Sequence, residues 1–303
     1  ENSKTFPVLI IDNAFVDGTR NVNLELSTPV GATLGNPATA VLSISDNDSG
    51  TATTNPIDDS TFFVRQHYYD FLSRVPDEGG LTYWSSVISS CGTDTLCIDS
   101  RRVGVSAAYF IELEFQETGG FVYRFYKASF GVRPTYAQFM PDRSSVVAGA
   151  NLDAGKAAFA EQWVQRSEFL QKYPPYLTGT QFIDALLQTI QQGSGVNLNS
   201  QRTALIDEYN AHGSRARVLQ MVAENADFKA AEYNNAFVLM QYFGYLRRDP
   251  DDGGYAFWLN ILNNGQPNNF RGMVCAFLTS AEYQTRFSPV ITRNDRLCGQ
   301  AAQ

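Results

Sequence analysis

Two stretches of this chain, one near each end of its helical part, follow one pattern without a gap. Residues 63–84 read FVRQHYYDFLSRVPDEGGLTYW, and residues 237–258 read FVLMQYFGYLRRDPDDGGYAFW. In both stretches apolar residues recur at positions i, i+4, i+7 and i+8, which is the spacing of one face of an amphipathic helix. This duplication constrains the fold strongly, because a unit of this length buries its apolar face only by packing against other units.

Two weaker copies lie between these stretches, and together the copies predict four degenerate helical repeats. The helices open on Phe63-Val64, Phe121-Val122, Phe182-Ile183 and Phe237-Val238, and they close on Glu114-Phe115, Glu168-Phe169, Asp227-Phe228 and Glu282-Tyr283. Because these two independent landmarks recur with nearly the same period, we predict an all-α array over residues 62–287. Its units are expected at about 62–118, 119–175, 178–232 and 234–287.

Each strong copy contains a turn motif of the form Arg-x-Pro-Asp-x-Gly-Gly-x-x-x-Trp. Its members are Arg74, Pro76, Asp77, Gly80 and Trp84 in the first copy, and Arg248, Pro250, Asp251, Gly254 and Trp258 in the last. We predict that the proline ends one helix, that the aspartate caps the next helix and pairs with the arginine, and that the glycines adopt positive φ. The tryptophan is expected to pack back on the tyrosine stripe. The alternative is that the Asp-Gly-Gly loops bind a metal ion or a sugar.

The segment before the repeats, residues 1–60, carries a different period. Apolar residues alternate with other residues at 6–10, 22–26 and 40–44, which predicts β-strands separated by turns. Residues 51–61 contain four threonines together with Asn55 and Pro56, and we expect them to form a linker. The predicted fold class is therefore α+β in separate domains, with a β segment at 1–50, the linker, the helical array, and a C-terminal tail at 288–303.

The charge of the chain argues against one class of partner. The net charge is −8, and the segment 1–60 holds eight acidic side chains against two basic ones. Phosphate-rich partners need a basic surface, so we expect no binding to nucleic acid. No run approaches the ~20 apolar residues of a membrane-spanning helix, so we expect no membrane span.

The four cysteines fall into two pairs along the chain, Cys91 with Cys97 and Cys275 with Cys298. Neither spacing is CxxC and the chain has only two histidines, so a zinc site is poorly supported. We predict two disulfides, the second of which clips the C-terminal tail. Disulfides persist in oxidising compartments, so we expect an extracellular or cell-surface location.

The sequence contains no recognisable catalytic pattern, and we expect no enzymatic activity. It has no nucleophile elbow, phosphate loop or HExxH motif. His67 lies on an aromatic helix face and is expected to be a hydrogen-bonded core residue, and His212 is expected at a helix end. The acids Glu112, Glu114 and Glu117 would suit a glycosidase pair, but Glu114 belongs to the repeated helix closing, which favours a packing role.

The repeat resembles the bacterial family called domain of unknown function 4214, which is similar to the linker repeats of phycobilisomes. The resemblance rests on the Phe-Val to Trp pattern and on the closings Ser280-Ala-Glu-Tyr283 and Ser167-Glu-Phe169. It spans about residues 62–287 and is strongest in the outer copies. It implies a helical module without known catalysis, found in large secreted or surface proteins.

Residues 4–50 resemble the second half of a Calx-β domain, an immunoglobulin-like sandwich that binds Ca²⁺ in some members. The matching stretches are TFPVLIIDNAFVDG at 5–18, VNLELS at 22–27 and AVLSISDND at 40–48. The resemblance implies candidate Ca²⁺ ligands at Asp12, Asp17, Asp46 and Asp48, with a polar turn cluster as the alternative and no other cofactor. The sequence departs from the family at Arg20, where an acidic residue is usual, and the first-half strands are not in this sequence.

These features together predict a structural role. A β segment with only half of its strands leaves apolar faces and edges uncovered. We expect a neighbouring copy to complete it, which gives a homo-oligomer, polymer or filament, or else contact with cell-surface components. The alternative is an adhesive or carbohydrate-binding module of a larger secreted surface protein.

Overall fold

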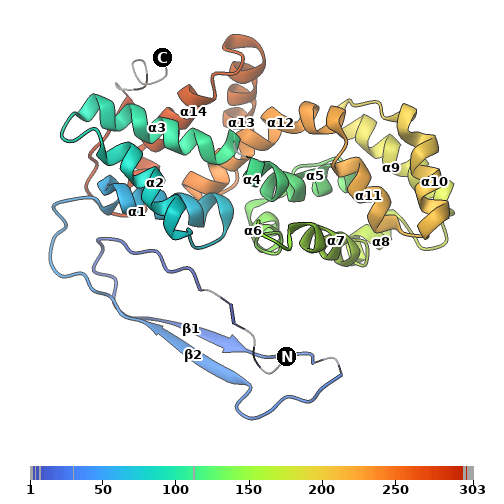
Figure 1. Cartoon of the computed structure of the whole chain (residues 1–303), viewed down its shortest axis with the longest axis horizontal. Coiled ribbons are helices and arrows are strands. Elements are labelled where there is room, and N and C mark those ends of the chain that lie inside the picture. Colours follow the sequence, from blue (N-terminus) through green and yellow to red (C-terminus); the bar gives the residue numbers. More distant parts are fainter. Residues whose placement is uncertain are drawn as a thin grey trace.

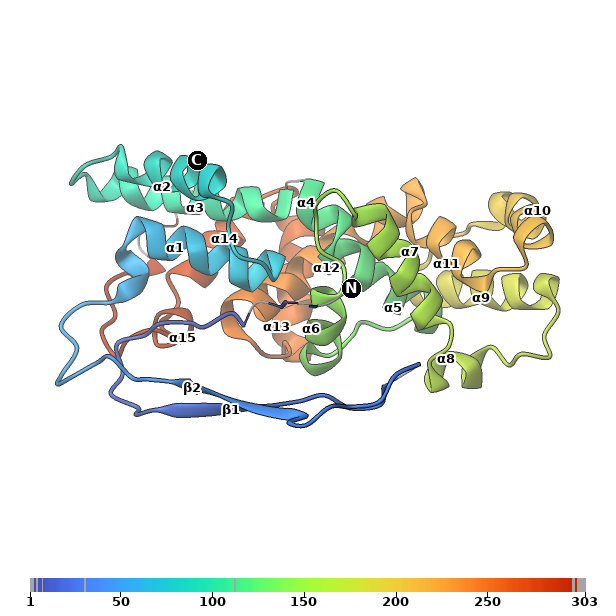
Figure 2. The same ribbon diagram turned by 60° about the horizontal axis from the view of Figure 1, so that its bottom comes forward.

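The computed structural model describes residues 3, 5, 6, 8–29, 31–111, 113–295 and 298. Most of these residues form a helical body, and a two-stranded ribbon lies beside it (Figures 1 and 2). The described chain is therefore mostly helical, with a small β element near its N-terminal end.

The β element consists of two antiparallel strands, β1 (Arg20–Glu25) and β2 (Thr39–Ile44). Val22 lies opposite Leu42 in the register, and the side chains alternate between half-buried and exposed along most of each strand. The two predicted stretches at 22–26 and 40–44 therefore pair with each other, because period-2 alternation places their apolar side chains on one face.

Residues 6–10 were also predicted to be a strand; residue 7 lies outside the described residues, and Phe6 and residues 8–10 are not in a strand. The sheet of the described chain has only two strands, and Phe6 is 67% exposed. No described residue before Asn55 is buried, so there is no core against which a third strand or an immunoglobulin-like layer would pack. Alternation by itself does not produce a strand without a partner edge and a surface to cover.

The described helices can be placed in the predicted units by their residue numbers. In chain order the described helices are η1 (Pro56–Asp58), α1 (Ser60–His67), η2 (Tyr68–Leu72), α2 (Glu78–Ser89), α3 (Thr95–Ile111), α4 (Leu113–Glu117), α5 (Gly119–Phe130), α6 (Tyr136–Ser144), α7 (Leu152–Trp163), α8 (Ser167–Lys172), α9 (Gly179–Ser194), η3 (Asn199–Gln201), α10 (Arg202–His212), α11 (Arg215–Ala223), α12 (Ala226–Gln241), η4 (Tyr242–Leu246), α13 (Asp252–Asn260), η5 (Ile261–Gly265), α14 (Phe270–Leu278) and α15 (Ala281–Gln284). The first unit holds α1 to α4, the second α5 to α8, and the third α9 to α11. Helix α12 leads from the third unit into the fourth.

The two strong copies of the repeat pack against each other, although they lie far apart in the sequence. Helix α3 lies along α14, and the rings of Phe71 and Tyr245 meet at 5.0 Å between centroids (Figure 1). The second and third units form the other half of the body, where α5 packs on α9 and α11. Each unit thus buries its apolar stripe against another unit, as short helical repeats must.

Both strong copies end their first long helix in a π-helical turn. Helix α1 continues into η2 and α12 continues into η4, and each turn ends at a residue with left-handed backbone, Ser73 (φ 52°) or Arg247 (φ 54°). Isolated π turns are rare. Finding the same irregular turn at equivalent positions shows that the two segments share one backbone.

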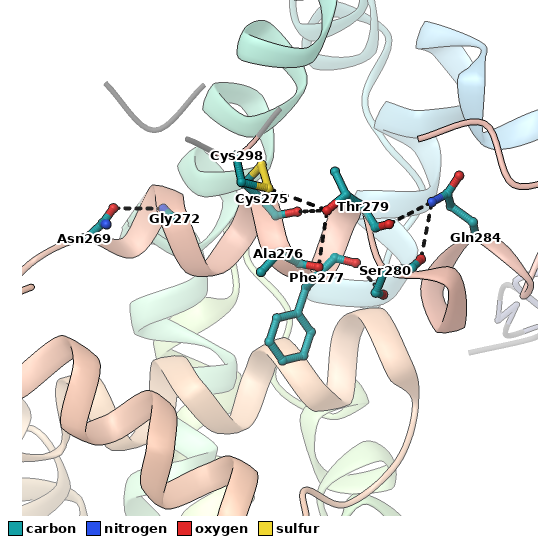
Figure 3. The surroundings of a disulfide bond; sticks show 9 residues. All are labelled: Asn269, Gly272, Cys275, Ala276, Phe277, Thr279, Ser280, Gln284 and Cys298. Atoms are coloured by element: carbon teal, nitrogen blue, oxygen red, sulfur yellow. Dashed lines mark hydrogen bonds between the residues drawn. A yellow bond between two sulfur atoms is a disulfide. The ribbon is translucent and has the colours of Figure 1, made fainter. Parts of the chain in front are cut away.

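Both predicted disulfides are confirmed. Cys91–Cys97 and Cys275–Cys298 join Cα atoms that are 5.6 and 5.4 Å apart. Figure 3 shows the second bond, beside which the Thr279 hydroxyl donates to the Cys275 carbonyl oxygen at 2.8 Å. This bond attaches Cys298 to α14.

The tail that begins at residue 288 folds back on the segment before α1. The Ser288 hydroxyl donates to the Thr54 carbonyl oxygen at 2.8 Å, and Asn55 Nδ2 donates to the Val290 carbonyl oxygen at 2.9 Å. Asn55 is itself buried. The second part of the expected linker at 51–61 therefore lies against the helical body, where it joins the two ends of the repeat array.

Candidate functional site

The repeated turn motif has the same geometry in both strong copies. Asp77 caps α2 by accepting a hydrogen bond from the Gly80 N–H at 2.7 Å, and Asp251 caps α13 by accepting one from the Gly254 N–H at 2.7 Å. The bond from Gly80 holds the pKa of Asp77 below its ordinary value. Because both carboxylates serve the backbone, the geometry favours the structural interpretation of these loops over a metal or sugar loop.

The glycines of the motif serve a purpose other than the predicted one. Gly80 and Gly254 lie in the first turns of α2 and α13, so their backbone is helical and not left-handed. A Cβ atom at either position would come within 3.0 Å of a tyrosine hydroxyl, from Tyr68 or Tyr242 respectively. The close approach of that hydroxyl leaves room only for glycine. The nearby residues with positive φ are Ser73 and Arg247, which lie before the motif glycines at the ends of the π-helical turns.

The arginines of the motif pair with the helix-closing glutamates. Arg74 donates from Nε and Nη2 to the two carboxylate oxygens of Glu114 at 2.7 and 2.8 Å, while Asp77 lies 3.5 Å away. Arg248 holds Glu282 in the same way, at 2.6 and 3.0 Å. The predicted pairing with the capping aspartate is therefore secondary. In each strong repeat a bidentate ion pair joins the turn motif to the helix closing.

The tryptophans of the motif lie half-buried at the edge of the aromatic core. Trp84 is 6.2 Å from Tyr109 between ring centroids, and Trp258 occupies the equivalent place in the fourth unit. Each tryptophan makes an edge contact with an exposed aromatic neighbour, Tyr83 or Phe257. The motif therefore presents one exposed ring from each strong copy.

The four candidate Ca²⁺ ligands do come together. A cavity of about 410 Å³ between the ribbon and the helical body is lined by Asp12, Asp17, Asp46 and Asp48.

Two carboxylates of this acidic cluster already bind other groups of the protein. Asp46 accepts hydrogen bonds from the N–H groups of Asp17, Gly18 and Asp48 at 2.7 to 2.9 Å, and Asp17 pairs with Arg20. Burial and the neighbouring carboxylates raise the pKa of Asp48. In the part of the chain that the structure describes, no group of His, Cys, Asp and Glu is arranged to hold a metal ion. The arrangement matches the polar turn cluster and lends no support to Ca²⁺.

His67 lies in the core between the first and fourth units. Its Nδ1 contacts the Phe63 carbonyl oxygen at 2.8 Å, and its Nε2 contacts Ser106 Oγ at 2.7 Å. Ser106 in turn shares a hydrogen bond with the Tyr245 hydroxyl. Burial lowers the pKa of His67 to about 4, so the ring is neutral near pH 7. This is the expected core histidine, and His212 ends α10 as expected.

A buried charge cluster in the same interface was not predicted from the sequence. Asp70, in η2, pairs with Arg247 at 2.9 Å and with Arg286 at 3.0 Å. Burial opposes the charged form, but these guanidinium groups hold the pKa of Asp70 below its ordinary value. The available signal was the repeat alignment, in which Asp70 stands opposite Gly244. Both aligned residues, Asp70 and Gly244, lie at the interface between the first and fourth units.

The ribbon and the chain around it expose several apolar side chains. They are Phe6, Val8, Ile10, Val16, Leu26, Leu34 and Val41. A described contact with the helical body is the hydrogen bond from Ala14 N–H to the Phe287 carbonyl oxygen at 2.7 Å. In a sheet of two strands each strand is also an edge, so the outer backbone groups of β1 and β2 face away from the described ladder.

The last part of the chain matches a known family. The family model described as Domain of unknown function (DUF4214) matches residues 218–287, which run from within α11 to just past α15. No curated protein and no solved structure matches the chain. The comparisons give no support to the Calx-β resemblance of residues 4–50. None of the helices in the described ranges combines the length and apolar character needed to cross a membrane.

Proposed function

We propose that this chain is a non-enzymatic extracellular structural protein that assembles with copies of itself through the ribbon of β1 and β2. The observation that carries the proposal is the two-stranded sheet, in which both strands are edges of the described ladder. A single ribbon of this size is marginally stable in water, so pairing with a further strand is favourable.

The donor segment in this proposal is residues 6–10 of a neighbouring copy. Its described residues pair with no strand of their own chain, and Phe6, Val8 and Ile10 are exposed at alternate positions. Added to an open edge, it would cover Leu26 or Val41, which are 66% and 63% exposed. Head-to-tail addition of this kind produces a filament unless the rotation between copies closes a ring.

The disulfides support the extracellular location, and the contacts of two buried polar side chains support the non-enzymatic role. Two disulfides are typical of proteins in oxidising compartments. His67 and Asp70, a histidine and an acid that are buried in the core, are held by hydrogen bonds and ion pairs. These observations support an extracellular structural role and speak against an enzyme.

Light scattering across a range of micromolar concentrations, followed by electron microscopy, tests the assembly. We expect the mass of the wild-type chain to rise with concentration and fibres or rings to form. Val41→Lys and Leu26→Lys should lower the mass, because a charge would then occupy each covered edge. Tyr176→Lys, at an exposed position between α8 and α9, is the control. A wild-type chain that stays monomeric at every concentration would overturn the proposal.

A second candidate function is an adhesive or carbohydrate-binding module that contacts the cell surface. The exposed rings of Tyr83 and Phe257, at equivalent places in the two strong copies, favour it. Exposed aromatic side chains supply large, rigid apolar faces for recognition. A glycan array probed with the full chain tests this candidate, and it fails if no glycan is retained.

A further inference from the structure

A polar groove runs beside α12 in the fourth unit and has no role in the proposed assembly. Its volume is about 680 Å³, which is within the range of about 300 to 1,000 Å³ typical of ligand sites. Five of its eleven lining residues carry amide side chains. They are Gln116 from α4, Asn234 and Asn235 from α12, Asn263 from η5, and Asn268.

These amides make the groove a site for both donors and acceptors without charge. Each asparagine side chain carries a carbonyl and an amino group. Asn234 Nδ2 donates to Asn263 Oδ1 at 2.6 Å, which fixes the two side chains relative to each other. The bond uses one polar group of each residue, so the carbonyl of Asn234 and the amino group of Asn263 remain as an acceptor and a donor for a ligand.

The charge of the groove points to a neutral ligand. Lys229 lines the groove, and its Nζ donates to Glu117 Oε1 at 3.0 Å. A second lysine, Lys156, contacts the same carboxylate, and this pairing holds the pKa of Glu117 below its ordinary value despite partial burial. Lys156 also pairs with Glu224 at 3.2 Å, so the two lysines face two carboxylates and an anionic ligand would gain little here.

Two aromatic rings complete the groove. Tyr233 and Phe270 line it and meet edge to face, with 5.5 Å between ring centroids and 73° between ring planes. Both side chains are half-buried, so each ring is held by the core and keeps part of its surface open. An apolar face beside several amides suits a molecule with a C–H face and hydroxyl groups at its rim.

The backbone around the groove is irregular in two places. Asn263 belongs to the π-helical turn η5, and Asn268 has a left-handed backbone with φ of 66°. Such conformations cost free energy and concentrate at binding sites, where they aim particular side chains. Both irregular residues contribute an amide to the groove.

We propose that this groove binds a neutral, hydroxyl-rich carbohydrate. The amides of Asn263 and Asn268 hydrogen-bond its hydroxyl groups, and Tyr233 and Phe270 contact a ring face. The inference rests on the second candidate function and assigns to it a ligand class and a groove that Tyr83 and Phe257 do not line. It is independent of the ribbon.

Isothermal titration of the full chain with neutral oligosaccharides tests the site, using glucans, xylans, mannans, galactans and chitin oligomers as probes. Asn263→Ala removes one amide, and Asn268→Gly removes another without straining the backbone. We expect each variant to weaken binding of the best probe roughly tenfold, as the loss of a ligand hydrogen bond predicts. Asn264→Ala is the matched control, because Asn264 lies on the same π turn and bonds to Asn260 at 2.9 Å.

Each outcome decides a separate point. Binding that Asn263→Ala and Asn268→Gly weaken, but Asn264→Ala preserves, supports the groove. Binding that neither groove variant changes overturns the groove and leaves the carbohydrate function standing. Retention of peptides or anionic glycans at the groove, or no retention of any neutral probe, overturns the proposal, and absence of all glycan binding removes the second candidate function as well. Thermal melting of each variant checks that the fold is intact.

Discussion

Phe71 of the first unit occupies the space that a side chain at Gly244 of the fourth unit would need. A Cβ atom at Gly244 would lie closer than 3.0 Å to three carbons of the Phe71 ring. The contact joins the two π-helical turns η2 and η4, which stand at equivalent positions of the repeat. A glycine in one copy thus lets an aromatic ring of the other copy enter the interface.

This relationship predicts that Gly244→Ala destabilises the protein. Overpacking a core costs about 1–3 kcal/mol of unfolding free energy, and here the added methyl group would collide with the buried Phe71 ring. Denaturant unfolding measures the change. Gly155→Ala is the control, since Gly155 lies inside helix α7 with nothing within 4 Å of an added Cβ. There the substitution should add about 0.5–1 kcal/mol. Equal effects at both positions would refute the packing argument.

Neighbouring glycines in the turn motif should respond differently to alanine. Gly80→Ala is expected to cost about 1–3 kcal/mol, because the new methyl group collides with the Tyr68 hydroxyl. Gly79→Ala should have little effect, since its nearest neighbour would be Asp77 Oδ1 at 3.6 Å. Thermal melting of the two variants distinguishes them. If the glycines served positive φ instead, both substitutions would be harmful.

Acid should destabilise the protein through His67. Its folded pKa of about 4 lies below the ordinary value of 6.5, so the unfolded chain binds the proton more tightly. The stability from the neutral ring is complete above pH 6.5 and falls as the pH drops from 6.5 towards 4, by about 3 kcal/mol in total. Unfolding experiments across this range measure the slope.

His67→Gln provides the control for that slope. The aligned residue in the fourth unit is Gln241, which is buried and donates to the Phe237 carbonyl oxygen at 3.3 Å, just as His67 contacts Phe63. The variant should therefore fold, and its stability should change less between pH 6.5 and pH 4. Asp70, Arg102 and Arg286 surround the ring and remain in the variant. An unchanged slope would assign the acid sensitivity to other groups.

The two ion pairs of the repeat should differ in strength. Arg74 and Glu114 are each about one quarter exposed, whereas Arg248 and Glu282 are nearly half exposed. Double-mutant cycles to alanine should give a coupling of about 1 kcal/mol for the first pair and about 0.5 kcal/mol or less for the second, because solvent screens the exposed pair more strongly. Coupling that is larger in the fourth unit would contradict this assignment.

The features that the sequence predicted are local ones. Helix caps such as Asp77 follow from residues three positions apart, and the two disulfides follow from the number and spacing of cysteines. The core position of His67 follows from the apolar stripe on its own helix. In each case the partners lie within a few turns of the chain, or the residue type limits the alternatives.

The features that the sequence did not predict depend on contacts between distant segments. The partner of Arg74 is Glu114, which lies beyond two further helices along the chain, and the reason for Gly80 is the hydroxyl of Tyr68 on another helix. The groove amides are scattered among other asparagines, so nothing in the sequence singles them out. At the N-terminal end, alternation predicted three strands, but only two of the described segments found an edge to pair with.

The sequence alone determined the repeat, its helical period, its capped turns and its disulfides, because these depend on residue type and short-range spacing. The tertiary structure decided that the first unit packs on the fourth, with Phe71 against Gly244 and Asp70 between two arginines. The physical reason is that four similar apolar stripes have several ways to pair. Only the three-dimensional fit of side chains across the interface selects one of them.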